Sequence, residues 1–205
     1  MGRYLGSKHK ICRRVGEALC GSAKCPVHKR NLPPGQHGSM KRQRKLSEYG
    51  VMMLEKQKLR FIFGLLEKQF RKYFQKAARM SGKTGYNLLL LLETRLDNLV
   101  YRAGFAPSIA AARQMVRHGH VIVDGRKTDV PSFQVKTGQT VKMKEKSRSK
   151  PTFIAFVEEN KDKLPDMPYL ERNLGSFEFK VKHMPKREEI PVAINEQLIV
   201  ELYSK

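Results

Sequence analysis

Apolar residues recur at helical spacing between Ser47 and Met80. Ser47 is a suitable N-cap because its hydroxyl can accept a hydrogen bond from a first-turn amide. Gly64 interrupts the pattern, which therefore predicts two helices, about 47–62 and 65–80, packed as a hairpin. The apolar positions that carry the pattern are Met52, Leu59, Ile62, Phe63, Leu66, Phe70 and Phe74.

Five consecutive leucines at 88–92 cover every side of a helix and predict a buried helix over 84–93. Further on, the pattern changes from helical spacing to short apolar runs. Asp124-Gly125 supplies the positive φ angles that a two-residue hairpin turn requires. The elements predicted here are a helix over 95–103, a helix over 108–117 capped by Ser108, a hairpin over 121–130 and a strand over 141–144.

The two ends of the chain have different patterns. Residues 1–46 show no sustained period and are rich in glycine, proline and charge, which is typical of an arm that orders against a partner or a metal. The tail predicts helices over 150–159 and 194–203 and a strand over 177–181. The fold class is therefore α+β. We expect four segments, namely a basic arm (1–46), a helical unit (47–93), a compact helix-helix-strand module (94–155) and a C-terminal segment packing on the others (156–205).

The net charge of the chain restricts the kinds of partner that it can bind. The 205 residues include 41 Lys and Arg against 19 Asp and Glu, giving a net charge of +22, and 40% of residues are apolar. Such a chain can build a core and attracts polyanions, so a nucleic acid is the expected partner. No apolar run approaches the roughly 18 residues that a membrane helix needs, so we expect no membrane partner. Acidic residues outnumber basic ones only in the tail, which suits protein neighbours.

A row of arginines is the first candidate site. Arg113 and Arg117 stand four residues apart on the predicted 108–117 helix, so they lie one above the other. Two guanidiniums in a row can each fork onto a phosphate. The alternative is that these are ordinary solvated charges. Neighbouring positions that would extend the patch are Arg95, His118, His120, Arg126 and Lys127.

The cysteines are the second candidate site. Cys12, Cys20 and Cys25 are an odd number and are crowded into the basic arm. This arrangement indicates a metal site or free thiols rather than a disulfide framework.

Residues 92–106 and 111–125, which include Arg95-Leu96-Asp97 and Arg117-His118-Gly119-His120, resemble the alpha-L RNA-binding module. The whole chain is also similar to the family of the fourth bacterial small-subunit ribosomal protein. Further stretches that match this family in order are residues 1–4, Pro33-Pro34-Gly35-Gln36-His37-Gly38, residues 55–60, residues 131–135 and residues 199–204.

The resemblance implies a cytoplasmic, ribosomal protein that is not an enzyme. It would bind small-subunit (16S) rRNA directly, nucleate assembly of the body of the subunit, and contribute to translational accuracy with the neighbouring fifth small-subunit protein, near the path by which mRNA enters. We expect the RNA contacts at Arg3, Arg13, Arg14, Gln36, His37, Lys41, Arg42, Arg44, Lys45, Arg95, Ser108, Arg113, Arg117, His118, His120, Arg126 and Lys127.

Two other functions are compatible with an RNA-binding module. A translational repressor would use the same patch on an mRNA leader. A pseudouridine synthase also carries this module, and Arg95-Leu96-Asp97 resembles the triplet that holds its catalytic aspartate. However, too little chain follows the module for a synthase domain. Asp97 is better explained as a cap or as an ion-pair partner of a nearby arginine such as Arg102.

The resemblance also bears on the cysteines. Zinc-bearing members of the family carry four cysteines in the arm, and the matching positions here are His9, Cys12, Cys20 and Cys25, with a shorter spacer. Imidazole is a competent zinc ligand, so the set resembles a Cys3His site for a structural zinc ion. His28 is a rival fourth ligand. The alternative is a degenerate remnant with free thiols.

Overall fold

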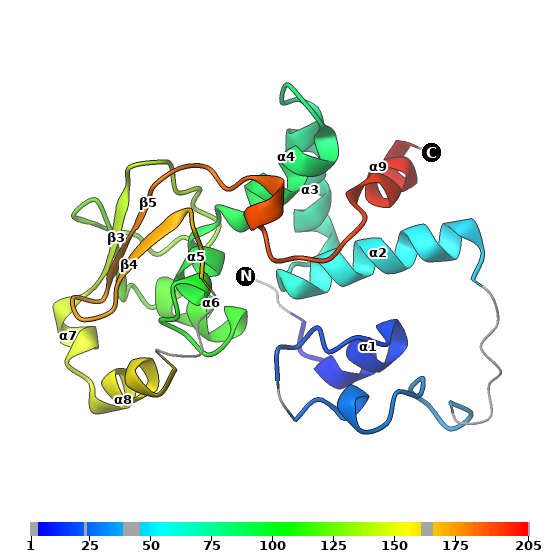
Figure 1. Ribbon diagram of the computed structural model, residues 1–205, viewed down its shortest axis with the longest axis horizontal. Coiled ribbons are helices and arrows are strands. Elements are labelled where there is room, and N and C mark those ends of the chain that lie inside the picture. The colour runs from blue at the N-terminus through cyan, green and yellow to red at the C-terminus, as the bar shows by residue number, and fades with distance from the viewer. Residues whose placement is uncertain (1–3, 23, 39–45, 161–165, 205) are drawn as a thin grey trace. The chain divides into compact units, whose positions relative to one another are not determined.

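The computed structural model describes residues 4–22, 24–38, 46–160 and 166–204. It confirms the expected α+β class, since helices accompany one antiparallel five-stranded sheet (Figure 1). By its contacts the chain divides into two compact units, Met1–Gly85 with Ala193–Lys205, and Tyr86–Val192. The four segments expected from the sequence stay a prediction. No helix of the described ranges is long and apolar enough to cross a membrane.

The first unit contains the two helices predicted around Gly64. They are α2 (Glu48–Ile62) and α3 (Glu67–Ala78), and the Ser47 hydroxyl caps α2 by accepting a hydrogen bond from the Gly50 amide at 3.2 Å. Both predictions are confirmed. The expected hairpin is wrong, because α2 has its main contacts with the C-terminal helix α9 (Glu196–Ser204). Ile199 of α9 is fully buried, and the local pattern did not reveal that α9 packs here.

The basic arm contains more regular structure than its pattern predicts. It forms the helix α1 (Lys8–Val15) and a 3-10 turn, η1 (Pro26–His28). Cys12 is the buried residue of α1, and its sequence is otherwise mostly polar, so the usual apolar period is missing. Gly16 ends the helix in the left-handed region, with φ of 85°.

The second unit begins within α4 (Thr84–Glu93), the helix predicted from the leucine run. It continues with the predicted helices, here α5 (Leu96–Arg102) and α6 (Ile109–Arg117), and Ser108 caps α6 by accepting from the Ala111 amide at 3.2 Å. The short helix α7 (Glu145–Arg148), the predicted helix α8 (Pro151–Asn160) and a 3-10 turn, η3 (Arg187–Glu189), follow.

The sheet of the second unit has the strand order β2-β1-β3-β5-β4, with every pair antiparallel. The predicted hairpin is confirmed, because Asp124 and Gly125 have φ of 45° and 80° at its turn. The strands are β1 (Val121–Val123), β2 (Arg126–Lys127), β3 (Thr140–Met143), β4 (Leu170–Asn173) and β5 (Glu178–Val181). Of these, β4 was not predicted.

One hydrophobic core holds the second unit together. Leu96, Leu99 and Val100 of α5 pack with the inward residues of the sheet, such as Val141 and Phe179. Burial of this kind contributes about 25 cal/mol per Å² of apolar surface. The loops and helix ends around the core are therefore held in place by a rigid scaffold, on which functional side chains can be positioned.

Candidate functional site

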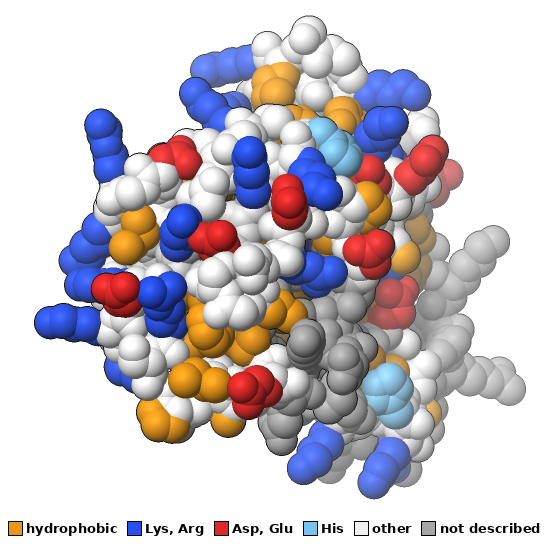
Figure 2. Space-filling model, turned by 60° about the vertical axis from the view of Figure 1, so that its left-hand side comes forward, with side chains coloured by type: hydrophobic (Ala, Val, Ile, Leu, Met, Phe, Trp, Pro, Cys, Tyr) orange, Lys and Arg blue, Asp and Glu red, His pale blue; other side chains and the backbone are white. Residues whose placement is uncertain are grey.

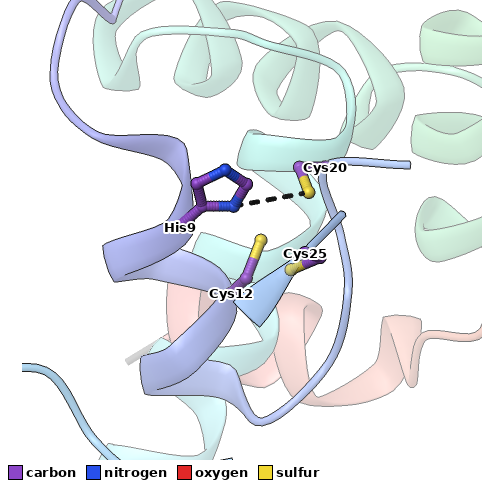
Figure 3. A group of neighbouring side chains, drawn as sticks. All are labelled: His9, Cys12, Cys20 and Cys25. Carbon is purple, nitrogen blue, oxygen red and sulfur yellow. Dashed lines mark hydrogen bonds between the residues drawn. The ribbon is translucent and has the colours of Figure 1, made fainter. Parts of the chain in front are cut away.

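Four potential metal ligands of the arm converge on one point. His9 and Cys12 lie three residues apart on α1, and Cys20 and Cys25 approach them from the chain that follows (Figure 3). The ligand atoms of the four side chains all lie within 4.8 Å of one another. The His9 Nδ1 to Cys20 Sγ distance is 3.8 Å. His28, the rival ligand, is exposed and is not part of this cluster.

The cluster fits a zinc ion in its donor types and its size. In a tetrahedral site with Zn–S near 2.3 Å and Zn–N near 2.0 Å, ligand atoms are about 3.5–3.8 Å apart. Cys12 and Cys25 are 0% and 1% exposed, and burial raises the pKa of the Cys12 thiol to about 12. A buried thiol becomes a thiolate only where a cation offsets that cost, and zinc would supply the charge. His9, Cys12, Cys20 and Cys25 are thus the residues that would hold it.

The arm is tied to its surroundings within the first unit. Arg13 donates from Nε to the Leu32 carbonyl at 2.8 Å and from Nη2 to the Pro33 carbonyl at 2.9 Å. Lys58 of α2 forms an ion pair with Glu17 at 2.7 Å. The RNA contact of Arg13 stays a prediction, and in the structure its Nε and Nη2 hold the arm's own backbone.

Other predicted RNA contacts of the arm divide into two groups. Arg14, Gln36 and His37 are exposed, so their side chains are accessible to a partner. The predicted contacts Arg3, Lys41, Arg42, Arg44 and Lys45 lie outside the described residues.

Arg95 and Arg113 of the second unit form an ion-pair cluster around one carboxylate. Arg95 donates to both oxygens of Asp97 at 3.0 and 2.7 Å, and Arg113 donates from Nε to Oδ2 at 2.8 Å. The side chain of Arg95 is 4% exposed and that of Asp97 is 1% exposed. The RNA contact of Arg95 stays a prediction, and in the structure this side chain is buried against Asp97. Arg113, at 15% exposure, is largely committed in the same way.

A second buried cluster involves Arg102. Its Nε donates to Glu93 at 2.7 Å, and the Tyr169 hydroxyl donates to the same carboxylate oxygen at 2.8 Å. Burial, together with the Glu93 charge, raises the pKa of Tyr169 well above its usual value, so its phenol stays a donor. Asp97 is an ion-pair partner, as expected, but of Arg95 and Arg113. The expected pairing of Asp97 with Arg102 is wrong, because Arg102 reaches Glu93 instead.

The solvent-facing cations lie at the end of α6 and on the β1–β2 hairpin. Arg117 is 63% exposed and meets Asp129 only loosely, at 3.8 Å. The side chain of Lys127 lies against Gly119, and a Cβ atom at position 119 would clash with it. His118 and Arg126 are also exposed. We call this group of exposed side chains the hairpin surface: Arg117, His118, Arg126 and Lys127.

Two predicted contacts are engaged within the second unit. The Ser108 hydroxyl caps α6, and His120 is half-buried with its Nδ1 2.8 Å from the Ser147 hydroxyl oxygen. Sequence reasoning overlooked exposed lysines close to His120, namely Lys144 and Lys150, whose charges lower its pKa together with burial. The alternation of lysines through residues 142–150 is the signal that would have found them.

Comparison with known proteins gives the family. Residues 3–93 match the Ribosomal protein S4/S9 N-terminal domain, and residues 94–141 match the S4 domain. The chain is 50% identical over 214 residues to the small ribosomal subunit protein uS4 of Geotalea daltonii. It is 51% identical over 205 residues to that of Brevibacillus brevis, and 48% identical over 208 residues to that of Chloroflexus aurantiacus. Each match covers 100% of both chains.

These relatives carry the name of a ribosomal protein and not of an enzyme, which overturns the synthase alternative. The ion pairs of Asp97 with Arg95 and Arg113 agree with a structural role for Asp97. From its two domain matches and its full-length relatives, the chain belongs to the uS4 family of small ribosomal subunit proteins.

Proposed function

We propose that the chain is a component of the small ribosomal subunit that binds 16S rRNA directly, with the hairpin surface as a principal contact. The observation that carries the proposal is the exposure of Arg117, Arg126 and Lys127 within the S4 domain. Exposed cations displace counterions from RNA phosphates, which favours binding. Folded RNA is recognised largely by shape and phosphate position, so a rigid basic surface serves better than a pocket.

The same module supplies the rigidity that this mode of binding needs. Arg113 on α6 is fixed to Asp97 on α5, so the two helices that support the surface are clamped together. Arg117, one turn further along α6, then projects from a fixed base. Its ion pair with Asp129 is long and exposed, so a phosphate can replace the carboxylate as the partner of Arg117.

The binding experiment uses the full chain with 16S rRNA, and 23S rRNA as the control. Affinity is measured by filter binding between about 50 and 300 mM salt. We expect tighter binding to 16S rRNA and a linear fall of log K with log salt, since neutralising several phosphates releases counterions from the RNA. Equal affinity for both RNAs at every salt concentration would reject the proposed function.

We further propose that this binding nucleates assembly of the body of the subunit, and that the chain supports translational accuracy with the fifth small-subunit protein near the mRNA path. The support is full-length similarity to uS4 proteins, together with the acidic excess of residues 151–205. Reconstitution without the chain should leave the body unassembled. Adding it late should not restore assembly as well as adding it first. Equal yields would contradict the nucleating role.

We also propose that a structural zinc ion, held by His9, Cys12, Cys20 and Cys25, folds the arm. Zinc bound by four side chains supplies folding free energy, on the order of 10–16 kcal/mol in small zinc peptides. Here Cys12 and His9 fix α1, while Cys20 and Cys25 fix the loop that follows. The arm would then present its exposed Arg14 to the RNA from a defined position.

Metal content and thiol reactivity test the zinc site. Protein purified without chelator should contain one equivalent of zinc, and its thiols should react only after a chelator is added. Cys25→Ser should abolish binding of the metal. His28→Ala is the matched control, because His28 lies close by in sequence but outside the cluster, and it should retain zinc. Three reactive thiols and no zinc would establish the free-thiol alternative.

A further inference from the structure

A cavity of about 370 Å³ lies in the second unit, and its lining includes His120, whose ring stacks on His118 of the hairpin surface with 6.1 Å between ring centroids. It opens between α6, the end of β3 and the α7–α8 segment, and its walls are mostly apolar. Its volume is in the range of pockets that hold small organic groups. The lining residues are Phe105, Pro107, Met115, His120, Met143, Ser147, Lys150, Phe153 and Phe156.

The aromatic walls are held by neighbouring rings. Phe153 packs against Phe177 at 5.3 Å between ring centroids, and Phe105 packs against Phe179 at 5.8 Å. Phe153 and Phe156 are only partly buried, so part of each ring is accessible. Rings fixed in this way offer flat apolar surfaces at little conformational cost to a planar group.

One edge of the cavity is polar. His120 lies there with its Nδ1 2.8 Å from the Ser147 hydroxyl. Burial and the charges of Lys150, His118 and Lys144 hold the pKa of His120 below its usual value near 6.5. At neutral pH the ring is therefore uncharged, and with Nδ1 bonded to Ser147 it leaves Nε2 for one hydrogen bond to an occupant.

The mouth of the cavity is positively charged. Lys150 lines it and is exposed, and Lys144 and His118 lie close enough to act on His120. Figure 2, which brings this unit forward, shows apolar side chains gathered on the surface with Lys and Arg side chains near them. An apolar side chain of a protein partner would gain nothing from these cations. A nucleotide combines a flat apolar ring with a negative phosphate and matches both features.

We infer that this cavity takes one unstacked nucleobase of the bound rRNA, stacked on Phe153 and Phe156, with its phosphate at Lys150. The inference rests on the proposed function and adds a base-binding subsite to a surface that otherwise contacts phosphates. Single-stranded bases splayed from folded RNA are commonly bound by stacking on aromatic rings. Stacking contributes about 1–3 kcal/mol per base, or roughly a 5-fold to 150-fold change in affinity.

Matched leucine variants test the subsite. Phe153→Leu and Phe156→Leu keep an apolar wall but remove the ring. As the control, Phe133→Leu removes a partly buried ring that packs on the same core but does not line the cavity. We expect each of the first two to weaken 16S rRNA binding by about fivefold or more, with an unchanged salt slope because no phosphate contact is lost. Phe133→Leu should bind like the unchanged chain. Circular dichroism and thermal unfolding identify any variant that fails to fold.

Ultraviolet crosslinking of the unchanged chain to 16S rRNA gives a readout that does not depend on variants. The proposal predicts nucleotide adducts on the peptides that contain Phe153 and Phe156. Equal affinity of all three variants, with no adduct on these peptides, would overturn it. A crosslink from this region to another ribosomal protein in assembled subunits, in place of RNA, would also overturn it. Salt-dependent 16S rRNA binding by the unchanged chain shows whether the proposed function itself stands.

Discussion

The S4 domain contains two sets of basic side chains that look alike in sequence and differ in solvation. Arg95, Arg102 and Arg113 have side chains that are 4%, 12% and 15% exposed, and each forms a short ion pair with a buried carboxylate. Arg117 is 63% exposed, and its nearest carboxylate is 3.8 Å away. The first set builds the fold, whereas the second remains available to a polyanion.

This difference shows that net charge alone does not locate an RNA-binding surface. A buried charge needs its partner because removing one member leaves the other uncompensated. An exposed pair contributes only about 0–1 kcal/mol and is easily exchanged. Solvent exposure together with the length of the ion pair, rather than basic character, separates structural arginines from candidate RNA contacts.

The largest expected loss of stability comes from removing a carboxylate of the buried set. Asp97→Ala should lower the free energy of unfolding by about 3–5 kcal/mol, because the buried Arg95 loses its carboxylate. Denaturant unfolding followed by circular dichroism measures the loss. Asp129→Ala is the matched control at the exposed pair and should change stability by less than about 1 kcal/mol. Equal losses in the two variants would remove the distinction between the sets.

A smaller effect is expected from the second buried cluster. Tyr169→Phe removes the hydroxyl that donates to Glu93 and should cost about 1–3 kcal/mol, since a hydrogen bond to a buried charge is lost. Under conditions in which Tyr169→Phe is folded, it should bind 16S rRNA with unchanged affinity. Tyr101→Phe, whose ring is half-buried beside Arg102, is the control and should change stability less. A loss of RNA affinity in a folded Tyr169→Phe protein would contradict a purely structural role.

In the first unit, the partly exposed carboxylate of Glu67 lies between the buried and the exposed sets, and it makes the stability of the fold depend on pH. Burial acts to raise the pKa of Glu67, but hydrogen bonds from Tyr203 and Lys56 outweigh it and hold the pKa below its usual value near 4.5. Glu67 therefore stabilises the fold above about pH 4.5, and this contribution disappears as the pH falls through the lowered pKa. The stability difference between the unchanged chain and Glu67→Gln should be constant near neutral pH and shrink in acid. A difference independent of pH would contradict this.

The local elements of the fold were predictable from sequence. Ser47 and Ser108 cap the helices that they were expected to cap, because an N-cap depends only on residues within one turn. The turn at Asp124-Gly125 was predictable for the same reason. By contrast, α1 was hidden by its polar sequence. Strand β4 was also hidden, since it is defined by pairing with β5 rather than by its own alternation.

The sites were predictable only in part. The cysteines' crowding indicated a metal site, and the family resemblance supplied His9 as the fourth ligand, which the structure brings together with the three thiols. The burial of Arg95 was not predictable, because it depends on the packing of Asp97 and on Arg113, 16 residues further along. The cavity beside His120 joins residues from 105 to 156, so no local motif reveals it.

The smallest effect on stability gives the most direct test of the central claim, that the exposed set binds RNA. The salt dependence of 16S rRNA binding is measured for Arg117→Ala/Lys127→Ala and for the charge-matched control Lys180→Ala/Lys182→Ala, whose lysines are exposed on and after β5. We predict that the first pair lowers the slope of log K against log salt by about 2, with unfolding unchanged, and that the control lowers it by less than about 1. Equal slopes in the two double variants would contradict the assignment of the hairpin surface.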